Sequence, residues 1–226
     1  MRLIFLAVTY LFQSASVLYK HRVKILFAIV IIANFWQKLY YINYHSVWVD
    51  EAFTLWMGLR PFKDAWQTLT TFGGDAPLYF IIMNLYVKVF GVGNFAARFL
   101  SILFSTATVG ILFFTGKKFV NTLFAVSVCV LYITSSFFLH YSLEIRPYAL
   151  AILLASLSIY FYLSHYKQTS KNALLIIALG VCNALMFYTH FLSFLLIVVE
   201  IFAAPILFIG NFEKYKRLFY SLLVAG

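Results

Sequence analysis

The sequence is poor in charge, and especially in acid. Only 11% of its 226 residues are charged, with seven Asp or Glu against 17 Lys or Arg, which leaves a formal net charge of +10. Hydrophobic residues make up 64% of the chain, and its mean hydropathy is +0.92. A soluble domain needs far more polar surface than this, so the composition excludes one and indicates a membrane protein.

Cysteine is scarce as well. Cys129 and Cys182 lie inside apolar runs, away from any metal-ligand spacing, so we interpret both as small buried hydrophobic residues. The positive charge does not predict nucleic-acid binding, because the basic residues are spread over short loops between apolar runs. We therefore expect membrane lipid as a partner and no nucleic acid.

Several apolar runs are long enough to cross a bilayer if flanking residues adjust for the shorter ones. Leu3–Tyr19 is interrupted by polar residues, and whether it is an interfacial helix, an extra span or a signal-like anchor stays open. We divide the chain into residues 1–23 and a transmembrane module over residues 24–226. The predicted spans are Ile25–Tyr44, Phe99–Phe114, Phe119–Leu139, Pro147–Leu163, Ala173–Tyr188 and Phe191–Ile209.

The last apolar run begins at Leu218 and stops at Gly226, short of the roughly 20 residues that a spanning helix needs. From this we expect the 226 residues to be the N-terminal part of a longer protein.

Lysines and arginines in short segments predict the orientation in the membrane. All of the basic segments can face the cytoplasm only if residues 45–97 make no net crossing, so we expect these residues to form a long first outer loop. Within it, Pro77–Phe90 is predicted as a juxtamembrane helix, begun by Asp75 as N-cap and by Pro77 in the first turn. The basic residues are Lys20, Arg22, Lys24, Lys117, Lys118, Lys167, Lys171, Lys214, Lys216 and Arg217.

The stretch "SVWVDEAFTLW" (Ser46–Trp56) places two adjacent acids, Asp50 and Glu51, among tryptophans at the start of the outer loop. As first-turn acids they would complement the dipole of a short helix, and the motif alone modestly favours this interpretation. Partial desolvation beside aromatic rings would instead raise the pKa of a carboxyl group and make it a better base. Both interpretations stay open on this segment.

The stretch "HYSLEIRPYAL" (His140–Leu150) places Arg146 just before a proline at the lip of a predicted span, two residues after Glu144. The planar guanidinium suits a phosphate, although a Glu144–Arg146 pair that only anchors the loop is equally compatible. His190, in "FYTHFLSF", lies at an outer turn. Glu200 lies in the middle of a span, where an acid is either functional or paired with a neighbouring helix.

In their order and spacing, these segments resemble the GT-C superfamily of membrane glycosyltransferases. The similar branch contains the protein O-mannosyltransferases and the bacterial aminoarabinose transferase that modifies lipid A. The resemblance covers residues 24–226 and is carried by "WVDEAFT", "DAPLYFIIMNLYVKVFG", "AARFLSILF", "YSLEIRPYALAILLASLSIY" and "YTHFLSFLL". It implies an all-α polytopic membrane protein, with seven shared N-terminal helices and a long, helical first outer loop carrying juxtamembrane helices.

The resemblance also implies an activity. The protein is expected to be a family 39-like glycosyltransferase of the bacterial plasma membrane, using a polyprenyl-phosphate-linked sugar as donor. Its acceptor would be a protein, a lipid or a glycan on the non-cytoplasmic face, with inversion at the sugar. No cofactor is implied with certainty, and a divalent metal is left open.

The resemblance assigns roles to individual residues as well. Asp50 matches the catalytic first-loop acid, with Glu51 as its usual neighbour. Where many relatives have His-Pro-Pro or Lys-Pro, this chain has an acid, Asp75, which would repel phosphate and is therefore assigned to the acceptor side, the cavity or a metal. The remaining expectations are donor-phosphate contacts from Arg98, Glu144 and Arg146 and cavity contacts from Tyr148 and His190.

Two other functions use the same features. A transporter or flippase for lipid-linked sugars would line a pathway with acids and arginines, although such proteins more often carry charges or broken helices at mid-bilayer. A non-catalytic subunit of a glycosylation complex is the second alternative, and the adjacent acids Asp50 and Glu51 argue against it only weakly.

Overall fold

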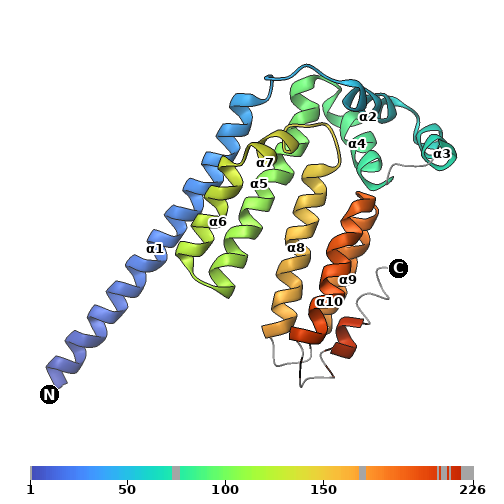
Figure 1. The fold of residues 1–226 in the computed structure, drawn as a ribbon. Helices are drawn as coiled ribbons and strands as arrows, with labels where there is room; N and C mark the ends of the chain where they lie inside the picture. Colours follow the sequence, from blue (N-terminus) through green and yellow to red (C-terminus); the bar gives the residue numbers. More distant parts are fainter. Residues whose placement is uncertain are drawn as a thin grey trace.

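The computed structural model describes residues 2–72, 77–167 and 172–207, together with positions 209, 213 and 215–219. Throughout this part of the chain the regular structure is helical (Figure 1). The elements are α1 (Arg2–Tyr41), α2 (Val49–Leu59), α3 (Phe62–Phe72), α4 (Pro77–Phe90), α5 (Asn94–Phe119), α6 (Thr122–Thr134), α7 (Ser136–Tyr141), α8 (Tyr148–Lys167), α9 (Ala173–Phe187), the 3₁₀ turn η1 (Phe191–Ser193) and α10 (Phe194–Leu207).

The described helices confirm an all-α membrane protein. By length and composition, three of them can cross a membrane: His21–Tyr41 within α1, Asn94–Phe119 and Tyr148–Lys167. The other predicted spans appear as the shorter apolar helices α6, α9 and α10. Residues 3–19, whose role was open, continue into the first of these spans as one helix, α1.

The predicted span Phe119–Leu139 is not one helix. It starts only at Thr122, because the Asn121 side chain accepts a hydrogen bond from the Phe124 amide at 2.8 Å and caps α6. It breaks at Ser135, whose backbone is extended, and continues as the short helix α7. Near this break the hydroxyl of Thr134 bonds back to the carbonyl of Val130 at 2.8 Å, a local alternative to regular helical bonding.

The transmembrane helices alternate in direction, and α2, α3 and α4 lie together at one end of the bundle (Figure 1). The C-terminal ends of α5 and α8, which carry Lys117, Lys118 and Lys167, lie at the opposite end. The ends of α7 and α9 and the start of α8 lie at the same end as α2–α4. The chain therefore brings the first loop and two later turns together, away from these basic residues.

The predicted helix over residues 77–90 forms with those bounds as α4, and it packs into the end of the bundle. Its Tyr79, Met83 and Val87 share one buried cluster with apolar residues of α5, α8 and α9. The Asn84 amide donates to the carbonyls of Gly58 at 3.0 Å and Arg60 at 2.8 Å, which holds the end of α2 against α4. Asp75, the predicted N-cap, lies outside the described residues.

Close helix packing surrounds the first cysteine. At the α5–α6 turn a Cβ atom on Gly116 would lie 2.7 Å from the Cα atom of Ala125, so only a glycine fits there. Cys129 is buried in the cluster that joins α1, α5 and α6, and Cys182 is buried on α9. Both cysteines are thus the small buried residues that the sequence indicated.

Candidate functional site

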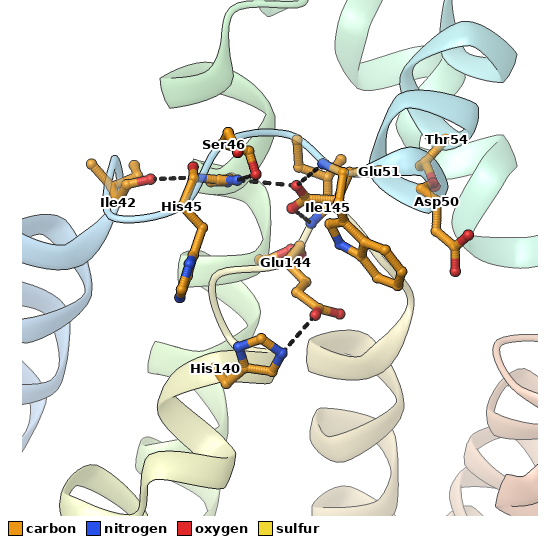
Figure 2. Close-up of polar contacts among 12 residues, drawn as sticks. Ile42, His45, Ser46, Asp50, Glu51, Thr54, His140, Glu144 and Ile145 are labelled. Carbon is orange, nitrogen blue, oxygen red and sulfur yellow. Dashed lines mark hydrogen bonds and ion pairs between the residues drawn. The ribbon is translucent and has the colours of Figure 1, made fainter.

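The two adjacent acids of the first loop have opposite surroundings. Helix α2 begins at Val49, so Asp50 and Glu51 both lie in its first turn, where carboxylates complement the helix dipole. The side chain of Glu51 is 1% exposed and that of Asp50 is 44% exposed. Figure 2 shows the two carboxylates pointing apart. Because successive residues project about 100° apart around a helix, one of the two faces the bundle and the other faces out.

Glu51 forms a buried ion pair with Arg98 of α5, with 3.0 Å between Oε2 and Nη2. The Arg98 Nη1 donates to the backbone carbonyls of Ile42 at 2.8 Å and His45 at 2.7 Å. The other carboxylate oxygen of Glu51 accepts from the backbone amide of Ile145 at 2.9 Å. This pair therefore ties together the end of α1, the start of α2, α5 and the loop before α8 (Figure 2).

A cavity of about 470 Å³ opens beside this ion pair. Its aromatic wall comes from Tyr41, Trp48, Tyr141 and Tyr148, which belong to four different segments of the chain. Its polar groups are His45, Ser46, Glu51, Arg98, His140 and Glu144. Aromatic walls with a few convergent polar groups are typical of small-ligand sites, so this is the candidate functional site.

Glu144 is the least satisfied acid of this cavity. Its Oε1 atom accepts from Nε2 of the half-exposed His140 at 2.9 Å, one helical turn earlier in the chain. Its Oε2 atom is buried and has no hydrogen-bond partner among the described residues. Burial raises the pKa of Glu144, and the nearby His140 partly opposes this shift. A buried acceptor without a donor is open to a ligand hydroxyl.

Arg146, in the loop before α8, forms a loose ion pair with Asp50. The closest distance between its Nη2 atom and the Asp50 Oδ2 atom is 3.9 Å, and the Arg146 side chain is 12% exposed. An ion pair this long and this accessible contributes little to stability. The pair therefore differs from the compact, buried Glu51–Arg98 pair a few residues away.

Of the remaining predicted residues, the structure places Tyr148 and His190 next to each other. Tyr148, at the start of α8, lines the cavity, and its ring centroid lies 5.6 Å from that of His190. His190 also stacks on Phe191. Asp75 lies outside the described residues. In the described part of the chain, no group of three or more His, Cys, Asp or Glu side chains is arranged to hold a metal ion.

Two histidines in this site were not selected from the sequence. His45 and His140 both line the cavity, and their ring centroids lie 5.9 Å apart. His140 lies four residues before Glu144, the spacing of two side chains on one helix face, and the two are in contact at 2.9 Å although α7 ends at Tyr141. That spacing was a usable signal for His140, whereas His45 reaches the site only through the packing of α1 against α5.

We predict strong coupling between Glu51 and Arg98. Arg98→Met leaves the buried Glu51 carboxylate without a counter-charge, and Glu51→Gln does the same to the buried Arg98 guanidinium. Each change should therefore lower the free energy of unfolding by about 3–5 kcal/mol. The double variant should cost clearly less than the sum, because it leaves no unpaired charge. Unfolding of the purified protein in detergent measures this. The matched control is Arg146→Met with Asp50→Asn, where coupling should stay below about 1 kcal/mol. Additive effects for the buried pair would contradict this account.

Comparison with known proteins gives one match. The family model described as dolichyl-phosphate-mannose-protein mannosyltransferase matches residues 74–225 of this chain. No curated protein and no solved structure was found to match it.

Proposed function

Because the chain belongs to the dolichyl-phosphate-mannose-protein mannosyltransferase family, we propose that it transfers a sugar from a polyprenyl-phosphate carrier to an acceptor, with inversion at the anomeric carbon. Membership makes it a membrane glycosyltransferase of the mannosyltransferase type, which uses a lipid-linked donor and an acceptor. The observation that carries the finer proposal is the loose Asp50–Arg146 ion pair at one end of the bundle, whose members lie one and two residues along the chain from the cavity-lining Glu51 and Glu144.

The chemistry of such a donor matches these two residues. When the acceptor hydroxyl attacks the anomeric carbon, the bond from that carbon to the phosphate oxygen breaks, and the polyprenyl phosphate leaves as an anion. No general acid is needed for this leaving group. A base is needed for the hydroxyl proton, and a positioned carboxylate contributes about 10²–10⁴-fold. In our proposal Asp50 takes that proton, and Arg146 stabilises the charge that grows on the phosphate.

The other polar residues have supporting roles in this proposal. Glu51 and Arg98 use their hydrogen bonds on each other and on the backbone, so they position α2 and thereby Asp50. The cavity, lined by Tyr148 and other aromatic rings, receives the sugar. The free Oε2 atom of Glu144 accepts from a sugar hydroxyl. His190 holds the ring of Tyr148 in place, while Asp75 stays a proposal for the acceptor side.

We also propose that this end of the bundle faces away from the cytoplasm, with residues 24–226 as the transmembrane module and residues 45–97 as its outer loop. The support is the separation of the candidate site from Lys117, Lys118 and Lys167 at the opposite end. A donor whose lipid tail stays in the membrane requires both reacting groups at the edge of the bilayer, which is where the end of a helical bundle lies.

Sidedness is tested with single cysteines in a variant lacking Cys129 and Cys182. Ser46→Cys and Thr71→Cys lie at exposed positions of the first loop, and Val120→Cys lies at an exposed position of the α5–α6 turn. In intact cells an impermeant thiol reagent should label the first two and should label Val120→Cys only after the membrane is opened. The reverse pattern would refute the proposed orientation.

The role of Asp50 is tested by Asp50→Asn, which keeps the size of the side chain but cannot accept a proton. Transfer from a saturating polyprenyl-phosphate sugar should fall by about 10²-fold or more, while donor binding changes little. A purely structural role in the first turn of α2 predicts little change in transfer, because loss of a first-turn carboxylate costs at most about 1 kcal/mol of stability. Transfer at nearly the wild-type rate would exclude Asp50 as the base. It would leave a transporter or a non-catalytic subunit as better interpretations.

Arg146 is tested with two changes. Arg146→Lys keeps the positive charge but loses the planar fork, and Arg146→Ala removes both, so donor use should weaken in that order. The expected signature is a higher KM for the lipid-linked donor together with a lower kcat, since the phosphate gains charge during the reaction. Lys63→Ala is the control, because Lys63 is an exposed cation of α3 that belongs to none of the ion pairs found among the described residues. Unchanged donor kinetics in Arg146→Ala would remove this residue from the phosphate site.

A further inference from the structure

Three polar side chains from three helices meet inside the apolar bundle. They are Ser158 of α8, Asn183 of α9 and Glu200 of α10, and each is at most 4% exposed. None of them lines the cavity of the candidate site. The Ser158 Oγ atom lies 2.6 Å from Asn183 Oδ1 and 2.6 Å from Glu200 Oε1, and Asn183 Nδ2 lies 2.8 Å from Glu200 Oε2. The three contacts close a ring.

The protons of this ring can be counted. If Glu200 is ionised, the ring holds one hydroxyl proton from Ser158 and the amide protons of Asn183. The amide serves the Asn183–Glu200 contact, and Ser158 is left with one proton for two acceptors, each at 2.6 Å. One of these two short contacts would then join two oxygen atoms with no hydrogen between them.

Exchanging the positions of the Asn183 amide nitrogen and oxygen does not supply the missing hydrogen. Its nitrogen then donates to Ser158, and Ser158 donates to Glu200, but the amide oxygen faces a carboxylate oxygen at 2.8 Å with no proton between them. One proton is therefore missing in either orientation. A protonated Glu200 supplies it, and every contact of the ring then has one donor and one acceptor.

The surroundings of Glu200 favour the same state. Among the described residues, Glu200 belongs to none of the ion pairs, so a carboxylate charge here would have no buried counter-charge. An unpaired charge inside an apolar bundle is costly, whereas a neutral acid with complete hydrogen bonds is not. A further bond ties the same helices together, since the Tyr162 hydroxyl donates to the backbone carbonyl of Glu200 at 3.0 Å.

We infer that Glu200 is held in its protonated, neutral form and that the Glu200–Ser158–Asn183 ring is a clamp that positions α8 and α9 for the candidate site. The start of α8 carries Tyr148 into the cavity. Just after α9, the carbonyl of Tyr188 accepts from the amide of Leu78 at 2.9 Å, which connects α9 to the first loop. Glu200 is therefore a positioning residue and is not a proton-transfer or ion-pathway acid.

Glu200→Gln is the decisive variant, because a glutamine amide donates and accepts as a protonated carboxyl group does. Glu200→Gln should unfold at nearly the wild-type temperature and keep its transfer activity. Glu200→Ala should lower the unfolding midpoint by about 5 °C or more, because it leaves two buried partners unsatisfied. A folded Glu200→Gln that loses transfer activity would overturn the inference, since it would show that an exchangeable proton is required.

A matched serine pair tests the ring itself. Ser158→Ala removes a bond between helices, whereas the Ser156 hydroxyl, on the same helix, donates to the carbonyl of Ile152 one turn earlier in α8 at 2.8 Å. Ser158→Ala should lower the unfolding temperature more than Ser156→Ala does, and equal effects would count against the clamp.

Infrared spectroscopy tests the protonation state directly. The difference spectrum of wild type minus Glu200→Gln, measured at neutral pH on purified protein, should contain the carbonyl band of a protonated carboxyl group. A carboxylate band in its place would overturn the inference. The infrared and unfolding measurements do not depend on transfer activity, so they stand even if the proposed function fails.

Discussion

The arrangement of the candidate site depends on one buried ion pair, between Glu51 and Arg98. A guanidinium that is 3% exposed can be tolerated in this apolar setting because a carboxylate and backbone carbonyls surround it. These carbonyls come from residues more than 50 positions earlier in the chain. The pair therefore fixes where the first loop leaves α1, where α2 begins and where the loop before α8 lies.

This constraint explains how adjacent acids can have different surroundings. Glu51 has both carboxylate oxygens engaged, by Arg98 and by the amide of Ile145. Such an acid is held in one orientation by its hydrogen bonds. Asp50, one residue earlier, is anchored by the same helix turn but keeps an accessible carboxylate. The rigid acid thus determines the position of the available one, and this follows from helix geometry alone.

Much of the fold could be predicted from the sequence. The helical membrane class follows from composition, and the bounds of α4 follow from the proline at its start and the glycine after its end. The opposite surroundings of Asp50 and Glu51 could not be predicted, because both occupy the first turn of α2 and only tertiary packing decides which one faces inward. The partners of Arg98 were also hidden, since they are distant backbone carbonyls that no side-chain pattern marks. The break at Ser135 is a local feature that hydropathy over a long window conceals.

The Glu51–Arg98 and Asp50–Arg146 ion pairs also differ in their hydrogen bonding. The Arg98 guanidinium donates to the Glu51 carboxylate and to the carbonyls of Ile42, His45 and Ser46, whereas the Asp50–Arg146 distance of 3.9 Å is too long for a direct hydrogen bond. In the proposed reaction, a phosphate bound to Arg146 draws the guanidinium away from Asp50. In this proposal the pair is suited to catalysis because separating its two charges costs little, which is also why it contributes little to stability.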